Sequence, residues 1–248
     1  MQMKVIVNGA NGTMGKYVIS TLQSGKYDAE AVALVSPSFT EGEKDKYPAL
    51  REYQGEADCV IDFSNHAGVR DLLDYCVSRQ LPVVIATTGH TPEEMELIRQ
   101  ASEKTAVFFS ANTSVGVAVL GDLIKRAAAA FTDMDIEIIE RHHNRKADAP
   151  SGTALMLANQ IKEVRENAEF VCGRNGHAKR QPNEIGIHAV RYGNEVGTHE
   201  IIFSNGLETV TIKHEAENRS LFADGAVKAA FFVCGKPAGF YAMKDLLA

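Results

Sequence analysis

The chain has 248 residues, of which 45 % are hydrophobic and 23 % are charged, and its formal net charge is -6. Such a composition is typical of a globular protein with enough residues for one large domain or two small ones. The negative balance argues against a nucleic-acid partner, because phosphate binding needs a clustered excess of Lys and Arg.

Short β-branched runs alternate with helical periodicity over residues 4–110, which is typical of a parallel sheet covered by helices. Thr91 is a natural N-cap for the third of these helices. This half is therefore predicted to be a doubly wound parallel sheet. Its strands are expected at residues 4–8, 31–35, 58–63, 82–86 and 106–109, and its helices at residues 14–24, 66–78 and 92–102.

The pattern changes after a long helix expected at residues 114–131. A strand is expected at 135–140, and a helix begins at Ser151, where Pro150 precedes a serine N-cap. This half is predicted to be α+β with a mainly antiparallel, or mixed, open sheet, and the change of pattern places a domain boundary near residues 111–113. Further strands are expected at residues 185–192, 198–204 and 208–214, and a last helix at 225–234.

Cysteine spacing and the distribution of apolar residues indicate the cellular compartment in which the protein is expected. The four cysteines form no C-x-x-C pair, so we expect reduced thiols and no disulfide framework. No stretch approaches the ~18 apolar residues of a membrane helix, and the N-terminal run lacks the pattern of a signal peptide. We therefore expect a cytoplasmic protein without a membrane partner.

A glycine-rich loop, G-A-N-G-T-M-G at residues 9–15, lies between the first expected strand and the first expected helix. In this context glycines allow a tight turn and let backbone N–H groups approach a pyrophosphate at the helix N-terminus. The spacing differs from the strict G-x-G-x-x-G, and a simple βα turn is the alternative. We predict a Rossmann-like dinucleotide site whose residues include Gly9, Asn11, Gly12, Thr13, Met14 and Gly15.

The end of the second expected strand bears on the choice of cofactor. A site that prefers NAD usually has Asp or Glu there to accept the ribose 2′-OH, whereas this chain continues as Val35-Ser36-Pro37-Ser38. Ser36 and Ser38, with Lys44 or Lys46, can hold a 2′-phosphate. NADPH is therefore favoured, with NADH use and a merely polar loop as the open alternatives.

The densest polar cluster covers residues 140–154 and lies between a strand and a helix. A histidine can deliver a proton near neutral pH, and Lys146 supplies a positive charge for an anionic or imine-bearing substrate. Ser151, Gly152 and Thr153 at a helix start offer N–H groups and hydroxyls that suit a carboxylate. Each residue alone has a structural explanation, but together they predict a catalytic site.

Metal binding is the other interpretation of the paired histidines. His142 and His143 are adjacent and point in different directions from an extended chain, whereas zinc sites need spaced ligands and further partners. We therefore predict no metal at this site.

The sequence E-R-H-H-N-R-K-A-D-A-P-S-G-T-A at residues 140–154 resembles the signature of the 4-hydroxy-tetrahydrodipicolinate reductases, also called dihydrodipicolinate reductases. The resemblance covers essentially the whole chain. It extends through T-T-G at 87–89, A-N-T-S-V-G at 111–116, V-R-Y-G-N-E-V-G-T-H at 190–199 and R-S-L-F-A-D-G-A-V at 219–227.

This resemblance implies an enzyme of lysine and diaminopimelate biosynthesis that reduces a cyclic dicarboxylate imine with hydride from NADPH or NADH. His142 would be the general acid, Lys146 and His143 would contact the substrate, and residues 151–153 would hold one carboxylate. The further cofactor residues that the resemblance implies are Phe63, Ser64, Thr87, Thr88, Gly89, Ser110, Asn112 and Thr113.

The resemblance also implies that residues 217–248 return to the dinucleotide domain of residues 1–111, leaving residues 112–216 as a substrate and oligomerisation domain. A homotetramer is expected. Two alternatives remain open: another two-domain reductase or dehydrogenase, such as one acting through a thiol, and a regulator that binds NAD(P) without turnover. No cysteine lies in the polar cluster, and a regulator needs no histidine beside a lysine.

Overall fold

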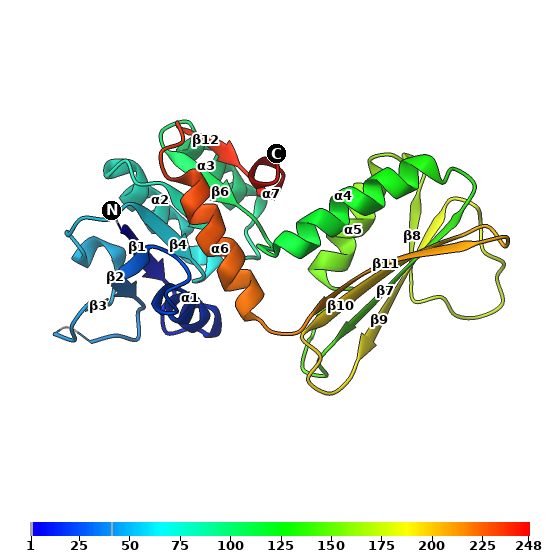
Figure 1. The fold of residues 1–248 in the computed structure, drawn as a ribbon, viewed down its shortest axis with the longest axis horizontal. Coiled ribbons are helices and arrows are strands. Elements are labelled where there is room, and N and C mark those ends of the chain that lie inside the picture. The colour runs from blue at the N-terminus through cyan, green and yellow to red at the C-terminus, as the bar shows by residue number, and fades with distance from the viewer. Residues whose placement is uncertain (1, 41) are drawn as a thin grey trace. The chain divides into compact units, whose positions relative to one another are not determined.

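The computed structural model describes residues 2–40 and 42–248. These residues form two compact units, one of the described residues within 1–115 and 219–248 and one of residues 116–218. Each unit is built on its own sheet (Figure 1). In the part of the chain that the structure describes, no helix combines the length and apolarity needed to cross a membrane.

The first unit contains a seven-stranded parallel sheet in the order β12-β6-β5-β4-β1-β2-β3. The order reverses at β1, whose neighbours are β2 and β4, and this is where open parallel sheets bind ligands, beyond the carboxyl ends of their strands. The strands are β1 (Met3–Asn8), β2 (Ala29–Val35), β3 (Lys46–Tyr47), β4 (Cys59–Asp62), β5 (Val83–Ile85), β6 (Ala106–Phe109) and β12 (Gly239–Tyr241).

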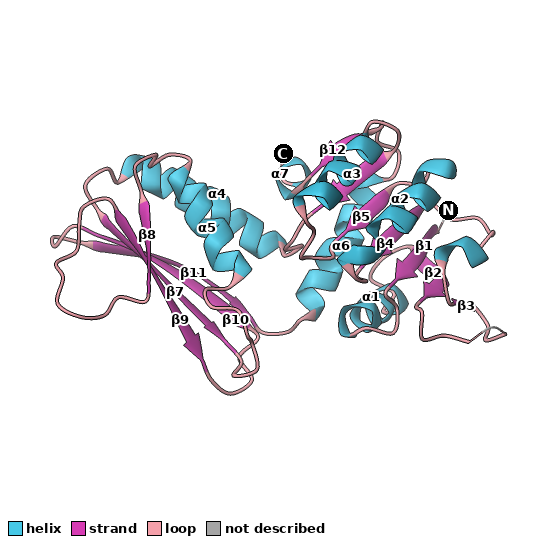
Figure 2. Ribbon diagram, turned by 180° about the vertical axis from the view of Figure 1, so that it is seen from behind, coloured by secondary structure: helices cyan, strands magenta, loops and turns pink. Residues whose placement is uncertain are grey.

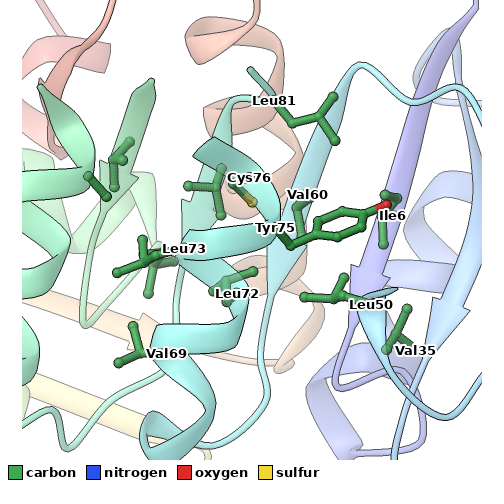
Figure 3. Close-up of a cluster of buried hydrophobic side chains, with 14 of the residues drawn as sticks. Ile6, Val35, Leu50, Val60, Val69, Leu72, Leu73, Tyr75, Cys76 and Leu81 are labelled. Carbon is green, nitrogen blue, oxygen red and sulfur yellow. The ribbon is translucent and has the colours of Figure 1, made fainter. Parts of the chain in front are cut away.

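Helices cover both faces of this sheet. Helices α1 (Thr13–Gln23) and α6 (Ser220–Val233) pack against each other on one face, and α2 (Val69–Ser78) and α3 (Pro92–Ser102) pack on the other (Figures 1 and 2). Buried residues of α2 meet strand residues such as Ile6 and Val60 in a dry cluster (Figure 3). The shorter helices are η1 (Leu50–Glu52), η2 (His66–Gly68) and α7 (Met243–Leu246).

The second unit contains a five-stranded mixed sheet in the order β11-β10-β7-β9-β8. Strand β7 (Asp135–His142) runs antiparallel to β10 (Gly197–Ser204) and parallel to β9 (Glu184–Arg191). The outer strands are β11 (Thr209–Ala216) and β8 (Glu169–Cys172). Helices α4 (Val115–Ala130) and α5 (Gly152–Lys162) supply apolar residues to the core beneath this sheet.

The predicted fold class is confirmed, and so are both predicted N-caps. Thr91 accepts from Glu94 N–H in a capping box, and Ser151 accepts from Ala154 N–H. Of the two sheet forms given in the prediction, the mixed one is found, because β9 and β8 run parallel to β7. The short strands β3, β8 and β12 were not predicted.

Two helix starts also differ from the prediction. Helix α2 begins at Val69, because Asn65 caps a short 3₁₀ turn before it. Helix α6 begins at Ser220, five residues ahead of Gly225. A Cβ at Gly225 would lie 1.8 Å from the carbonyl oxygen of Thr113, so this glycine permits close packing inside the helix and does not mark its start.

Candidate functional site

A cleft of about 990 Å³ lies in the first unit, around the glycine-rich loop and the ends of β1, β2 and β4. Its position matches the strand-order reversal described above. The predicted cofactor residues that line it are Gly9, Gly12, Ser36, Phe63 and Ser64.

Two glycines make the loop at this cleft possible. Gly9 has a φ of +82°, and a Cβ there would lie 2.3 Å from the carbonyl oxygen of Phe63. A Cβ at Gly15 would lie 2.2 Å from the carbonyl oxygen of Gly9. Because Gly12 is the N-cap of α1, no capping side chain covers the first N–H groups of this helix. The loop therefore presents the backbone donors that an anion needs.

Polar side chains join the glycine-rich loop to the end of β2. The amide nitrogen of Asn11 donates to Ser38 Oγ at 2.8 Å, and Ser38 Oγ lies 2.9 Å from Ser36 Oγ. The Lys46 ammonium pairs with Glu43 and does not line the cleft. Arg51, which was not predicted, does line it, and 81 % of its side chain is exposed.

Asp62 at the end of β4 organises the floor of this region. Its side chain is almost completely buried and accepts hydrogen bonds from Asn8 at 2.7 Å, Ser64 Oγ at 2.6 Å and Thr87 Oγ at 2.6 Å. Burial raises the pKa of Asp62, and these three neutral donors oppose the rise. Asp62 thus fixes two of the predicted cofactor residues, Ser64 and Thr87.

The remaining predicted cofactor residues follow β1, β5 and β6. Two hydrogen bonds hold residues 110–113. Ser110 Oγ donates to the Asn112 carbonyl at 2.6 Å within the segment, and Thr113 Oγ donates to the Phe222 carbonyl of α6 at 2.7 Å. At the start of α1 Thr13 is exposed and Met14 is half-buried, and after β5 Thr88 and Gly89 are exposed.

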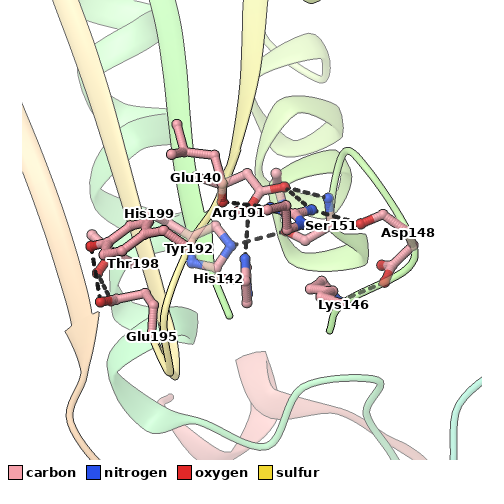
Figure 4. A network of polar contacts seen from close by, with 12 residues as sticks. Glu140, His142, Lys146, Asp148, Ser151, Arg191, Tyr192, Glu195, Thr198 and His199 are labelled. Carbon is pink, nitrogen blue, oxygen red and sulfur yellow. Dashed lines mark hydrogen bonds and ion pairs between the residues drawn. The ribbon is translucent and has the colours of Figure 1, made fainter. Parts of the chain in front are cut away.

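The polar centre of the second unit is Glu140, which is completely buried (Figure 4). Arg191 donates to both of its carboxylate oxygens, at 2.8 and 2.7 Å, and Ser151 N–H donates at 2.9 Å. The Nδ1 of His142 lies 2.5 Å from Glu140. Burial alone would raise the pKa of Glu140, but the bonds from His142, Arg191 and Ser151 outweigh it and lower this pKa to about 2.

Glu140 determines how His142 is presented. Because the Glu140 carboxylate is ionised, Nδ1 of His142 must carry the proton in their hydrogen bond. Nε2 is then the nitrogen left for chemistry. A Cβ at Gly197 would lie 3.0 Å from Nε2, so this glycine leaves space beside the atom. The arrangement is that of a histidine oriented by a buried acid.

The predicted substrate residues surround this pair. The Lys146 ammonium lies 2.8 Å from Asp148, and 22 % of the lysine side chain is exposed. The hydrogen bond from Lys146 is the main cause of the lowered pKa of Asp148. His143 is anchored by its backbone N–H, which donates to the Glu195 carbonyl at 2.8 Å. Gly152 and Thr153 begin α5, directly after the Ser151 cap.

Another histidine lies beside the pair and was not among the predicted site residues. His199 of β10 is 4 % exposed, and its Nε2 lies 3.1 Å from Ser151 Oγ. Its ring packs edge-to-face with that of His142, at 5.3 Å between centroids. Burial and the neighbouring His142 lower its pKa to about 3.

The sequence carried a signal for some of the residues that prediction missed. Ile136, Ile138, Glu140 and His142 alternate along β7 on its buried face, so the apolar period itself places Glu140 inside. Asp62 ends a buried apolar strand, where a carboxylate is unexpected. The contact of Arg191 with Glu140 has no local signal, because the two residues lie in different strands.

Both halves of the chain match one protein family. Residues 3–113 match the family description "Dihydrodipicolinate reductase, N-terminus", and residues 116–247 match "Dihydrodipicolinate reductase, C-terminus". The 4-hydroxy-tetrahydrodipicolinate reductase of Caldanaerobacter subterraneus subsp. tengcongensis is 46 % identical, with 100 % of this chain and 99 % of that protein covered. That of Clostridium tetani is 43 % identical, with 100 % and 98 % covered.

A solved structure agrees with these relatives. Dipicolinate-bound dihydrodipicolinate reductase from Paenisporosarcina sp. TG-14 superimposes with a TM-score of 0.81 at 26 % identity, covering 98 % of each chain. A myo-inositol dehydrogenase from Corynebacterium glutamicum, at 16 % identity and a TM-score of 0.60 over 97 % of this chain and 90 % of that one, shares the fold alone.

The parallel sheet with its glycine-rich cleft, joined to a second unit with a buried acid–histidine pair, defines a two-domain NAD(P)H-dependent oxidoreductase. Within that class, the chain belongs to the dihydrodipicolinate reductase family. The resemblance found in the sequence is thereby confirmed, together with the prediction of a reductase of lysine and diaminopimelate biosynthesis.

Proposed function

We propose that the chain reduces the conjugated cyclic imine derived from 4-hydroxy-tetrahydrodipicolinate to tetrahydrodipicolinate, using NADPH or NADH. The observation that carries this proposal is the buried Glu140 network, which holds His142 by Nδ1 on the strand that leads into the loop of Lys146 and Ser151. The dipicolinate in the related solved structure is a planar dicarboxylate of the class proposed here as ligand.

His142 is the proposed general acid. Hydride addition to a conjugated imine places electrons in the ring that a proton must neutralise. Nε2 of His142 delivers this proton, while Glu140 holds Nδ1–H and stabilises the charged imidazolium before transfer. Removal of such an acid costs about 10²- to 10⁴-fold in rate.

The substrate carboxylates are held by the loop and the helix that follow β7. The Lys146 ammonium neutralises one of them, and His143 contacts the substrate beside it. The N–H groups at the start of α5 and the hydroxyls of Ser151 and Thr153 donate hydrogen bonds to the other carboxylate, and Gly152 leaves room for its approach.

The residues of the first unit fit a dinucleotide. The tight backbone packing that Gly9 and Gly15 permit leaves the N–H groups at the uncapped N-terminus of α1 as a cradle for a pyrophosphate. The bound nicotinamide supplies the hydride. Asp62 holds Ser64 and Thr87 in fixed positions at the adjacent strand ends.

We further propose a preference for NADPH. Ser36 stands at the end of β2 where an acid would repel a 2′-phosphate, and Arg51 supplies a cation from the turn that follows β3. Strand β3 pairs with the last residues of β2, and Ser36 N–H donates to the Tyr47 carbonyl at 3.0 Å. These contacts bring the turn of Arg51 to the same edge of the sheet as Ser36.

The reaction is tested by mixing the protein with NADPH and the fresh condensation product of aspartate semialdehyde and pyruvate, and following nicotinamide absorbance. His142→Gln and Lys146→Ala are each expected to lose most turnover and to keep NADPH affinity. The exposed residues His177 and Lys179 provide the matched controls His177→Gln and Lys179→Ala. Full activity in either site variant contradicts the assigned role.

The cofactor preference has its own test. Arg51→Leu is expected to raise the KM for NADPH about 10-fold, the loss of one charge-assisted contact, and to leave the KM for NADH nearly unchanged. Arg99→Leu on α3 is the matched control, because this side chain is 63 % exposed and does not line the cleft. An equal change for both cofactors contradicts a 2′-phosphate contact.

We propose a dinucleotide domain of residues 1–111 with 217–248 and a substrate domain of residues 112–216, assembled as a cytoplasmic homotetramer. The two compact units support the first part. Light scattering of the purified protein tests the second, with a mass of four chains expected. A thiol mechanism is not favoured, because none of the four cysteines lies in the polar cluster of residues 140–154.

A further inference from the structure

His199 sits where the general acid and the carboxylate cradle meet. His199 pairs with Glu140 of β7 in the register of the sheet. Its ring contacts the ring of His142, and its Nε2 lies within hydrogen-bond distance of Ser151 Oγ. Among the residues that the structure describes, none hydrogen-bonds Nδ1 of His199, although that atom is buried. A buried histidine with a single polar contact, made to a proposed substrate-binding hydroxyl, calls for an explanation.

The position of the His199 ring proton can be inferred by asking which ring nitrogen would be left without a hydrogen-bond partner in each case. If Ser151 Oγ–H donated to Nε2, the ring proton would sit on Nδ1 as a buried donor without a partner. If Nε2–H donates to Ser151 Oγ, only an acceptor lone pair is left on Nδ1, and orphaned acceptors are better tolerated than orphaned N–H groups. Burial also keeps the His199 ring neutral, with a pKa of about 3, so it carries one proton only.

The second arrangement has a consequence for Ser151. Its Oγ already accepts from Ala154 N–H at 3.1 Å, and a bond from His199 occupies its other lone pair. The hydroxyl then has its proton alone to offer, and bonds that it accepts polarise this proton. A carboxylate, which only accepts, is the group that such a hydroxyl binds.

We propose that His199 is a positioning residue, which donates from Nε2 to Ser151 Oγ and so commits the Ser151 hydroxyl proton to a carboxylate of the substrate. The inference rests on the proposed function, since it assigns the helix start at Ser151 to that carboxylate. It predicts an effect on substrate affinity, because the contact forms in the ground state and the transition state alike.

The test uses His199→Phe and His199→Gln. Phenylalanine removes the donor, so the KM for the substrate and the Kd for pyridine-2,6-dicarboxylate are expected to rise about 10-fold, with kcat changed less than about 3-fold. Glutamine can place an N–H donor near the Nε2 position and is expected to restore most of the affinity. His188→Phe is the matched control, because this half-buried histidine of β9 bonds Glu137 instead.

A double-mutant cycle distinguishes positioning from simple packing. In a Ser151→Ala background, His199→Phe should add less than about 2-fold to the Kd, because the hydroxyl through which it acts is gone. Thermal unfolding checks the folding of each variant, and His199→Met replaces any phenylalanine variant that does not fold. Additive losses, an unchanged Kd or a loss confined to kcat would each overturn the proposal.

If the wild-type protein fails to reduce the substrate but His199→Phe still weakens dicarboxylate binding, the reaction assignment fails and this inference stands.

Discussion

Two buried carboxyl groups, Asp62 in the first unit and Glu140 in the second, have opposite electrostatic environments. Both lie at or near the end of a strand, and both are less than 3 % exposed. Asp62 is surrounded by neutral donors and its pKa is raised by burial. Glu140 meets a guanidinium and an imidazole, and its pKa is lowered to about 2 despite burial.

The difference follows the kind of ligand that each unit handles. In the function proposed above, the first unit binds its cofactor mainly through backbone N–H groups, and Asp62 holds hydroxyl and amide side chains around the cleft. The second unit then needs a histidine that delivers a proton, and an ionised Glu140 would stabilise its charged form. Glu140 therefore has charged hydrogen-bond partners and Asp62 has neutral ones.

The sharpest test of this comparison pairs Glu140→Gln with Asp62→Asn. We expect Glu140→Gln to lower kcat about 10²- to 10⁴-fold, because an amide cannot stabilise the imidazolium of His142. It also leaves the Arg191 guanidinium without its carboxylate, at a cost of about 3–5 kcal/mol in the free energy of unfolding. Steady-state kinetics and urea unfolding followed by circular dichroism measure both effects.

Asp62→Asn serves as the paired variant in the other unit. It keeps the volume and disturbs only neutral hydrogen bonds, so we expect a loss of about 1 kcal/mol in unfolding free energy and a weaker effect on turnover. Equal losses in the two variants would show that the charge of the partners does not matter, and the comparison would fail.

Much of the fold could be predicted because its signals are local. The period of apolar residues fixed the long elements, and Thr91 and Ser151 marked helix starts through capping that involves only the next turn. Strands β3, β8 and β12 are edge strands, and their short sequences lack the continuous apolar run that marks the equally short central strands β4, β5 and β6. The parallel pairing of β7 with β9 depends on contacts 49 residues apart, such as Ile136 with Ile185, which no local pattern encodes.

The candidate site divides in the same way. His142, Lys146 and Ser151 lie within ten residues and were predicted together from their chemistry. Arg191 and His199 come from strands 51 and 48 residues away from their respective partners, Glu140 and Ser151, so only the sheet register brings them in. Sequence alone thus predicted the groups that we propose to contact the ligand, and it did not identify the contacts that hold them in place.

The second prediction concerns the backbone design of the first unit. Gly15→Ala places a Cβ 2.2 Å from the carbonyl of Gly9 and 2.7 Å from Ala10 Cα, where both obstacles are rigid backbone. We expect a loss of about 1–3 kcal/mol in stability and an NADPH Kd raised about 10-fold or more, as the loop shifts. The control is Gly68→Ala, at a residue that also lines the cleft but where a Cβ would meet no atom within 4 Å. Calorimetric titration with NADPH decides, and unchanged affinity contradicts a backbone-built site.

The third prediction is a difference in pH dependence. Glu140 has a folded-state pKa lowered from 4.5 to about 2, so its stabilisation is present above pH 4.5 and is lost as the pH falls toward 2. The raised pKa of Asp62 means that its protonated form stabilises the fold below 3.8, and this contribution is lost as the pH rises through the raised value. Urea unfolding between pH 2 and about 6 should therefore show the cost of Glu140→Gln growing with pH and the cost of Asp62→Asn shrinking. Slopes of the same sign would contradict the opposed designs.

The smallest expected effect comes from an exposed charge beside the buried ones. Asp148 is 57 % exposed and holds the Lys146 ammonium at 2.8 Å, so their pair contributes under about 1 kcal/mol and is screened by salt. It competes with the substrate carboxylate for the same ammonium. Asp148→Asn is therefore expected to lower the substrate KM about 2- to 5-fold at low ionic strength, with little change in kcat and a smaller effect at high salt.

The control is Asp135→Asn, because Asp135 is equally exposed and is paired with Arg180. A raised KM would mean that Asp148 positions Lys146 for the substrate, and the pair would then belong with Glu140 and Arg191 as part of the supporting network.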